Sequence, residues 1–105
     1  MLLNVQLPVP PSGLVPEDII LDHQAGMAEK SLAPARRICE RFGIRYRATS
    51  LEGEPAEAIA GYARRTRCKE IIMGTRGLGR ISGLVLGSVA IKVIHLASVP
   101  VTLVK

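Results

Sequence analysis

The chain has 105 residues, a length that suits one domain with a single core. Apolar residues make up 48% of it and aromatic residues only 3%, which favours a core of Val, Ile, Leu and Ala and excludes a stacking platform for nucleobases. The net charge of +5 favours anionic partners, whereas two distant cysteines and the lack of a long apolar run exclude a zinc site and a membrane span, as in a cytoplasmic protein.

The first half of the chain predicts a strand followed by a long helical region. Leu2–Leu7 is a short apolar run that ends at prolines, as a buried strand does. Glu17–Arg41 has acids at its front and bases at its back, with Gly43 in the place of a C-terminal cap. Pro34 removes one backbone donor, so the sequence predicts a kink or break near residues 30–33.

The second half alternates short strands with helices. Ile44–Leu51 alternates apolar and polar residues, which is typical of an edge strand, and a helix begins near Pro55. Lys69–Gly74 is a third strand, and Val99–Lys105 closes the chain as a fourth. Between them, one face of a helix is lined by Leu86, Val89, Ala90, Val93 and Ala97.

This alternation predicts an α/β fold in which a parallel sheet is flanked by helices on both faces, as one domain over residues 1–105. Ligands of such sheets bind beyond the carboxyl ends of the strands. The segment Gly74–Ser88 follows the third strand and holds five of the ten glycines. It is therefore the candidate binding segment.

The glycine spacing distinguishes between kinds of phosphate site. A P-loop requires a lysine that this segment lacks, and a dinucleotide-binding fingerprint would need glycine at position 82, where Ser82 stands. What is present is Gly74, Gly77 and, nine residues later, Gly87 followed by Ser88. Glycines allow close backbone approach, and free amides at a helix start bind phosphate, so the pattern predicts a phosphate cradle.

The motif resembles the one carried by ATP-binding universal stress proteins, Gly-x2-Gly-x9-Gly-Ser/Thr. Its flanks, "KEIIMGTRGLG" and "LGSVAIKVIHLASVPVTLVK", are similar to the family's last strand, loop, helix and strand. "LLNVQLP" resembles the family's second strand, and "SLAPARRICERFGI" the end of its second helix. The resemblance covers nearly the whole chain.

The resemblance implies a stress-response regulator that binds ATP, with or without Mg²⁺. In that site phosphates contact Gly77, Gly87, Ser88 and the Val89 amide. The residues matched to the whole nucleotide site are Val5, Met73, Gly74, Thr75, Arg76, Gly77, Gly87, Ser88 and Val89. Family members also pair their last strands antiparallel, which implies a homodimer through Val99–Lys105.

The family pattern also contains a first strand, an acid-bearing turn and a first helix that this sequence does not match. Because the family's first strand is central, the sheet is expected to be split, and N-terminal truncation is the favoured explanation. The gap could instead be closed by pairing Leu2–Leu7 with Lys69–Gly74, or by a strand from a second chain. We expect weak ATP binding, or none, for the chain by itself.

Catalysis and nucleic-acid binding are less well supported. Ser88 and His95 are seven residues apart on one predicted helix, about 10 Å along its axis, so they cannot act as nucleophile and base, although weak ATP hydrolysis stays open. The basic residues between Arg64 and Arg80 lack interleaved aromatic residues. The alternative function is a dimeric scaffold of the same family that binds no nucleotide.

Overall fold

A computed structural model describes residues 1–10, 12–75 and 86–105. The chain divides into two compact units, Met1–Glu54 and Pro55–Lys105. We call them unit 1 and unit 2 and describe each by itself. Together their described residues form four strands and three helices in alternation, which confirms the predicted α/β class.

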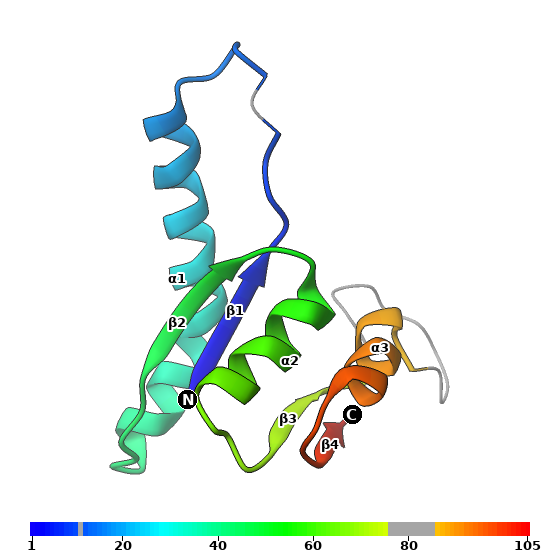
Figure 1. Cartoon of the computed structure of the whole chain (residues 1–105). Coiled ribbons are helices and arrows are strands. Elements are labelled where there is room, and N and C mark those ends of the chain that lie inside the picture. Colours follow the sequence, from blue (N-terminus) through cyan, green and yellow to red (C-terminus); the bar gives the residue numbers. More distant parts are fainter. Residues whose placement is uncertain (11, 76–85) are drawn as a thin grey trace. The chain divides into compact units, whose positions relative to one another are not determined.

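Unit 1 consists of one parallel strand pair and one long helix (Figure 1). The strands are β1 (Leu2–Gln6) and β2 (Ala48–Glu52), paired from Leu2 opposite Ala48 to Gln6 opposite Glu52. Helix α1 (Glu17–Arg41) packs mainly against β1. Strand β2 begins four residues later than the alternation predicted, because residues 44–47 are in no regular structure.

The sequence predicts a kink or a break before Pro34, but helix α1 is continuous through Pro34, so it does not break there. Ala28 and Leu32, one turn apart, are the buried residues of the helix and hold it against the strands. A hydrogen bond of 3.1 Å from Arg36 to Glu29 spans the proline on the exposed side. Packing and this bridge keep the helix intact although Pro34 lacks its amide donor.

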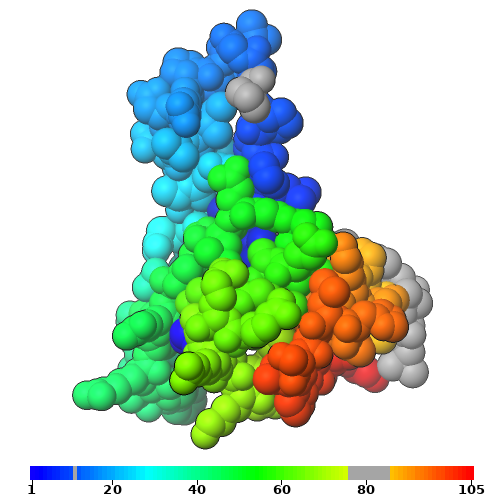
Figure 2. All heavy atoms as spheres, viewed as in Figure 1, coloured from blue at the N-terminus to red at the C-terminus, as the bar shows by residue number. Residues whose placement is uncertain are grey.

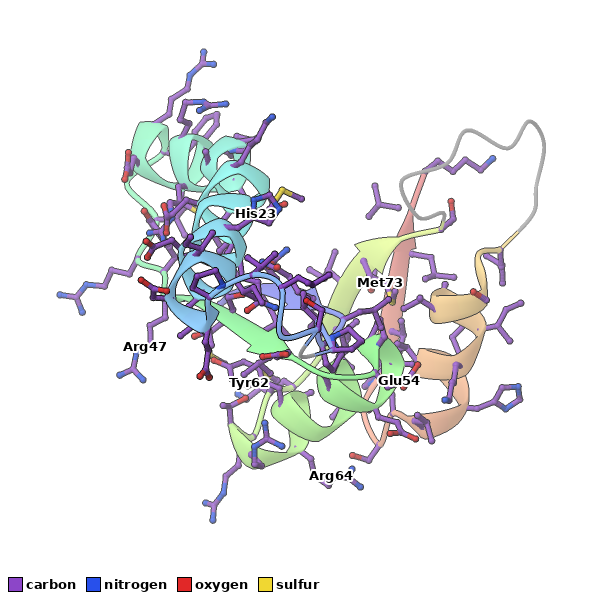
Figure 3. The ribbon with its side chains drawn as sticks, turned by 90° about the horizontal axis from the view of Figure 1, so that it is seen from above. His23, Arg47, Glu54, Tyr62, Arg64 and Met73 are labelled. Carbon is purple, nitrogen blue, oxygen red and sulfur yellow. The ribbon has the colours of Figure 1, made fainter. Side chains whose placement is uncertain are left out.

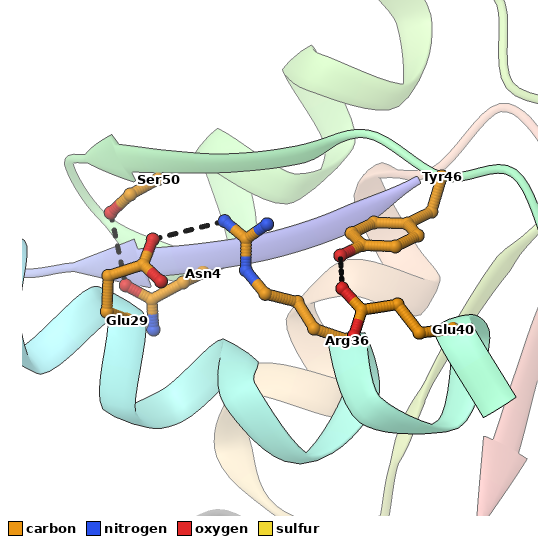
Figure 4. A network of polar contacts seen from close by, with 6 residues as sticks. All are labelled: Asn4, Glu29, Arg36, Glu40, Tyr46 and Ser50. Atoms are coloured by element: carbon orange, nitrogen blue, oxygen red, sulfur yellow. Dashed lines mark hydrogen bonds and ion pairs between the residues drawn. The ribbon is translucent and has the colours of Figure 1, made fainter.

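The C-terminal end of α1 carries a polar cluster and a glycine cap. Tyr46 donates to the Glu40 carboxylate at 2.9 Å (Figure 4). The pKa of the Arg36 guanidinium is raised by its hydrogen bond to Tyr46 and, to a smaller extent, by Glu29. Gly43 has φ of +65°, and its amide bonds the Glu40 carbonyl while the Ile44 amide bonds that of Cys39. This is the predicted glycine cap, in the form of a Schellman motif.

Unit 2 contains the second strand pair and two helices. Helix α2 (Pro55–Arg65) precedes β3 (Ile71–Gly74), and α3 (Ser88–Leu96) precedes β4 (Val101–Val104). The strands are parallel, with Ile71 opposite Val101. The two helices pack closely on each other (Figure 2). The buried residues of α2 are all alanines, and Glu57 of α2 lies 3.8 Å from Lys92 of α3.

The core of unit 2 is an apolar cluster. Its buried members are Ala56, Ala63, Ile71 and Val93, and both Ala56 and Val93 are fully buried, at 0% exposure. Val89, Val101 and Ala97 pack around them. The helix face predicted from Val89, Ala90, Val93 and Ala97 is thus confirmed, whereas Leu86 is 37% exposed.

The strands form two separate pairs, β1 with β2 and β3 with β4. The expected split of the sheet is confirmed. The first pair belongs to unit 1 and the second to unit 2. Pairing of Leu2–Leu7 with Lys69–Gly74 would join the two units and stays a prediction. In the described parts of the chain, no helix is long and apolar enough to cross a membrane.

Candidate functional site: a strand end joined to a helix start

In unit 2, two backbone hydrogen bonds join the end of β3 to the start of α3. The Thr75 amide donates to the Val104 carbonyl at 3.0 Å, which extends the strand ladder by one residue. The Thr75 carbonyl then accepts from the Gly87 amide at 2.6 Å. The two ends of the glycine-rich segment therefore lie side by side at the carboxyl end of β3, where α/β proteins bind ligands.

Helix α3 begins at Ser88 and has no side-chain cap. Gly87 is its N-cap residue, and its carbonyl accepts the first helical bond, from Ile91 at 3.1 Å. The amides of the first turn, at Ser88, Val89 and Ala90, have no acceptor within the helix because such acceptors would lie before its start. Helix α3 thus begins where the sequence predicts, and anion binding by these amides stays a prediction.

Ser88 and Val89 have different roles at this helix start. Ser88 is exposed, so its hydroxyl is accessible beside the free amides. The Val89 side chain packs against the core of unit 2, which leaves only its backbone amide for an external group. An anion placed here would meet backbone donors and one hydroxyl, together with the positive end of the helix dipole.

The backbone conformations of Gly74 and Gly87 do not require glycine. Gly87 has φ of −66° and ψ of 156°, which any residue adopts, and Gly74 is an extended residue of β3 opposite Val104. Neither is among the described glycines with positive φ, which are Gly13, Gly43 and Gly53. What glycine provides at both positions is the absence of a side chain, and hence close approach to the backbone.

The other predicted residues are distributed as follows. Met73 lies on β3 (Figure 3), half-buried, with its side chain against the core of unit 2, so only its backbone is available at the strand end. Val5 lies on β1 in unit 1, opposite Leu51 and half-buried. Arg76 and Gly77 lie outside the described residues.

The sequence reading missed a polar group on β1. Leu2–Leu7 was predicted as a buried apolar strand, but Asn4 and Gln6 bond each other at 3.1 Å, and Ser50 on β2 bonds Asn4 at 3.1 Å. The available signal was the spacing of Asn4 and Gln6, since residues two apart on a strand share a face. Val5 between them points to the opposite face.

Comparison with known proteins gives a family match over the whole chain. The family model described as "Universal stress protein family" matches residues 1–105. This is the family that the glycine motif and its flanks resemble.

Individual relatives match over parts of their length. Universal stress protein MJ0531 of Methanocaldococcus jannaschii is 35% identical over 77 residues, which is 73% of this chain and 45% of that protein. A Thermus aquaticus universal stress protein, named for the QAH/OAS sulfhydrylase 3' region, is 49% identical over 55 residues, which is 52% of this chain and 40% of that protein. Stress response protein NhaX of Bacillus subtilis is 32% identical over 90 residues, which is 86% of this chain and 52% of that protein. The chain spans about half the length of these relatives or less.

Among solved structures, that of hypothetical protein MJ0577 is similar with a TM-score of 0.81 and 24% sequence identity. The match covers 98% of this chain and 72% of that one. At this identity the likeness shows the fold, an α/β arrangement of parallel strands and helices.

Proposed function

Because this chain belongs to the universal stress protein family, we propose that it is a cytoplasmic stress-response protein that binds an adenine nucleotide, ATP, through its phosphates. The phosphates would bind at the start of α3, beside the end of β3. The described donors are the amides of Ser88 and Val89 and the Ser88 hydroxyl. Gly77 completes the motif, and Mg²⁺ would accompany the phosphates as it does in other nucleotide sites.

One observation carries this proposal: the 2.6 Å bond from the Gly87 amide to the Thr75 carbonyl. It holds an uncapped helix start against a strand end, which brings the first-turn amides and the exposed Ser88 close to the end of β3. The glycines on both sides of this bond have conformations open to any residue. Bare backbone at these two positions suits a bulky anion that must approach within hydrogen-bonding distance.

The nucleoside would lie toward the end of β3. By the family resemblance, Met73, Gly74 and Val5 line that part of the site, with Thr75 and Arg76 shaping the loop. The Met73 side chain is already used in the core, so its contact with a nucleoside would be through the backbone. Backbone amides and carbonyls there would orient the nucleoside through directional hydrogen bonds.

We propose a binding rather than a catalytic role. Ser88 opens α3 and His95 lies in its last turn, so the helix holds them about 10 Å apart. Among the described residues there is no group of three or more His, Cys, Asp or Glu side chains that could hold a metal ion. A nucleotide at this site would act by its presence, as a regulatory ligand.

The proposal is tested by equilibrium dialysis of the purified chain with ATP and with AMP. We expect ATP to bind more strongly than AMP, because the described donors address phosphates, and more weakly than low-micromolar. Gly87→Ala should weaken ATP binding by placing a methyl group against the phosphate position. Gly26→Ala is the matched control, since a Cβ at Gly26 on α1 meets nothing within 4 Å.

Equal affinity for ATP and AMP would contradict a phosphate site, as would unchanged binding by Gly87→Ala. Low-micromolar affinity would contradict the expected weakness. Mass spectrometry of the denatured protein for co-purified ATP or AMP checks the same point without added ligand. The complete absence of binding would leave the scaffold function as the better account.

A second candidate function, a homodimeric scaffold, is favoured by the free edge of β4. The carbonyls of Pro100 and Val104 accept bonds from β3, at 2.9 and 3.0 Å. Because strand groups alternate, the amide and carbonyl of Leu103 face the other edge, which pairs with no described strand. Leu103→Pro should therefore lower the dimer mass measured by light scattering. A chain that is monomeric at all concentrations would contradict the scaffold.

A further inference from the structure

Unit 1 contains a solvent-open pocket of about 190 Å³ at the carboxyl ends of β1 and β2, under α1. Its apolar wall comes from α1, from Leu21, Ala25 and Ala28. Its polar wall includes Gln6 at the end of β1 and Ser50 and Glu52 on β2. Gln6 and Val5 point to opposite faces of the strand pair, so this pocket is distinct from the nucleotide contact assigned to Val5.

The hydrogen bonds of this wall fix which of its atoms can bind a ligand. Gln6 Nε2 donates to the Gln24 carbonyl at 2.8 Å, and a carbonyl can only accept, so the orientation of the Gln6 amide is determined. The same nitrogen contacts Asn4 at 3.1 Å, so Asn4 must present its oxygen, Oδ1. Ser50 Oγ lies 3.1 Å from that oxygen and must donate to it (Figure 4).

Both N–H donors of Gln6 and the hydroxyl donor of Ser50 are thereby used inside the protein. Gln6 is left with its oxygen, and Ser50 with the lone pairs of its hydroxyl. Glu52 adds a carboxylate, which is also an acceptor. Gln24, which also lines the pocket, carries an amide that can either donate or accept. Toward Gln6, Ser50 and Glu52, a ligand must therefore supply the hydrogens.

The charge around the pocket is negative. Residues 1–29 contain no Lys or Arg, and the acids of this stretch are Glu17, Asp18, Asp22 and Glu29. The basic residues of unit 1 begin only at Lys30 and continue to Arg47. A cation would be attracted to the acidic end. Glu52 is the one carboxylate lining the pocket, too few for Ca²⁺ or Mg²⁺, which take several oxygen ligands, most of them charged or carbonyl.

We propose that this pocket binds a primary ammonium group on a short aliphatic chain. The ammonium has three donors and no acceptor, which matches Glu52, Ser50 and the Gln6 oxygen. The aliphatic part lies along Leu21, Ala25 and Ala28. Apolar cavities of about 150 Å³ bind benzene, so the pocket suits a molecule of about six to eight non-hydrogen atoms. This ligand and site are additional to the proposed nucleotide site.

The experiment is a titration of the ¹⁵N-labelled chain with pentylamine, followed by amide NMR. Pentan-1-ol and pentanoate serve as the neutral and anionic probes of equal length. We expect saturable shifts at Ser50–Gly53 and at Leu21–Ala28 with the amine, affinity lower by about threefold to fivefold for the alcohol, and no binding of pentanoate. Nα-acetyl-lysine N-methylamide, tested alongside, distinguishes a lysine side chain on a peptide from a free amine as the source of the ammonium.

Two variants separate the pocket from general surface charge. Glu52→Gln should reduce amine affinity to that of the alcohol, whereas Glu17→Gln, which removes an equal charge from a residue that does not line the pocket, should leave it unchanged. Ala25→Leu keeps every charge and should abolish binding of both amine and alcohol by filling the pocket, with the spectrum reporting that the fold is retained. Equal binding of amine and pentanoate, equal effects of the two charge variants, or shifts confined to residues outside Ser50–Gly53 and Leu21–Ala28 would overturn the proposal.

Discussion

Units 1 and 2 are built on the same plan, a parallel strand pair with helical cover, but the polarity of the residues on their strand faces differs. In unit 2 the buried cluster is wholly apolar, and Ala56 and Val93 are inaccessible to solvent. In unit 1 the face of the strand pair under α1 carries Asn4, Gln6 and Ser50, joined by hydrogen bonds. Close apolar packing leaves little space, whereas directional bonds hold side chains apart and allow a pocket to form beside them.

This difference fits the two proposed sites. The backbone proposed to bind phosphate in unit 2 must be held rigidly, and α3 is held by the buried residues Ala90 and Val93. The pocket of unit 1 depends on the directions of a few donors. The comparison therefore predicts that the stability of unit 2 falls when buried side-chain volume is removed, whereas that of unit 1 falls when side-chain hydrogen bonds are removed.

The largest expected effect is that of Val93→Ala. Removing two methyl groups from the fully buried side chain should lower the free energy of unfolding by about 2 kcal/mol, measured by urea denaturation. Val104→Ala makes the same change at a residue that is 52% exposed and should cost much less. Equal losses for the two variants would contradict a core centred on Val93.

The helix caps of the two units provide a sharper comparison. Gly43 after α1 and Arg67 after α2 both have positive φ, +65° and +54°, and both close Schellman motifs. Gly43→Ala should lower the free energy of unfolding by about 1 kcal/mol. No atom lies within 4 Å of the added Cβ, so the loss would come from backbone strain alone. Thermal denaturation measures it, and an unchanged melting temperature would contradict the cap.

The hydrogen-bonded face of unit 1 is tested by Asn4→Ala. This change removes the oxygen that accepts from both Gln6 and Ser50, and should cost about 1 kcal/mol in unfolding experiments. Asn4→Asp keeps an acceptor at the same place and should cost less. If both variants lose the same stability, the Asn4 oxygen does not stabilise the fold by accepting hydrogen bonds from Gln6 and Ser50.

The smallest expected effect is a gain. Arg67 adopts a left-handed conformation that glycine accepts without steric cost, so Arg67→Gly should raise the free energy of unfolding by about 0.5 kcal/mol after the entropy cost of glycine. Arg64→Gly, inside the last turn of α2, should have the opposite sign. A loss of stability for Arg67→Gly would mean that its side chain makes a stabilising contact.

Much of this architecture could be predicted from the sequence. The order of strands and helices, the cap at Gly43, the helix front at Ser88 and the split sheet all follow from local patterns and the family resemblance. The predicted break at Pro34 does not occur, because tertiary packing of Ala28 and Leu32 and the Glu29–Arg36 bridge outweigh a local helix-breaking preference. The sequence also predicted β1 as a buried apolar strand. Its high apolar content drew attention away from Asn4 and Gln6, which lie on the same face of the strand.

The candidate phosphate site was predicted in part. Sequence spacing located the glycines, but it could not reveal that Gly87 bonds the Thr75 carbonyl, since that bond depends on how strand and helix meet in space. Nor could spacing reveal that Gly74 and Gly87 have ordinary backbone conformations. The pocket of unit 1 lay beyond prediction because its lining comes from three elements separated along the chain.

The central claim, that the free amides at the start of α3 bind nucleotide phosphates, is tested most directly by amide NMR during titration with ATP. The account predicts that the largest and earliest shifts occur at Ser88 and Val89, that they saturate, and that AMP at the same concentrations shifts them less. Shifts confined to other parts of the chain, or none at Ser88 and Val89 up to millimolar ATP, would contradict it.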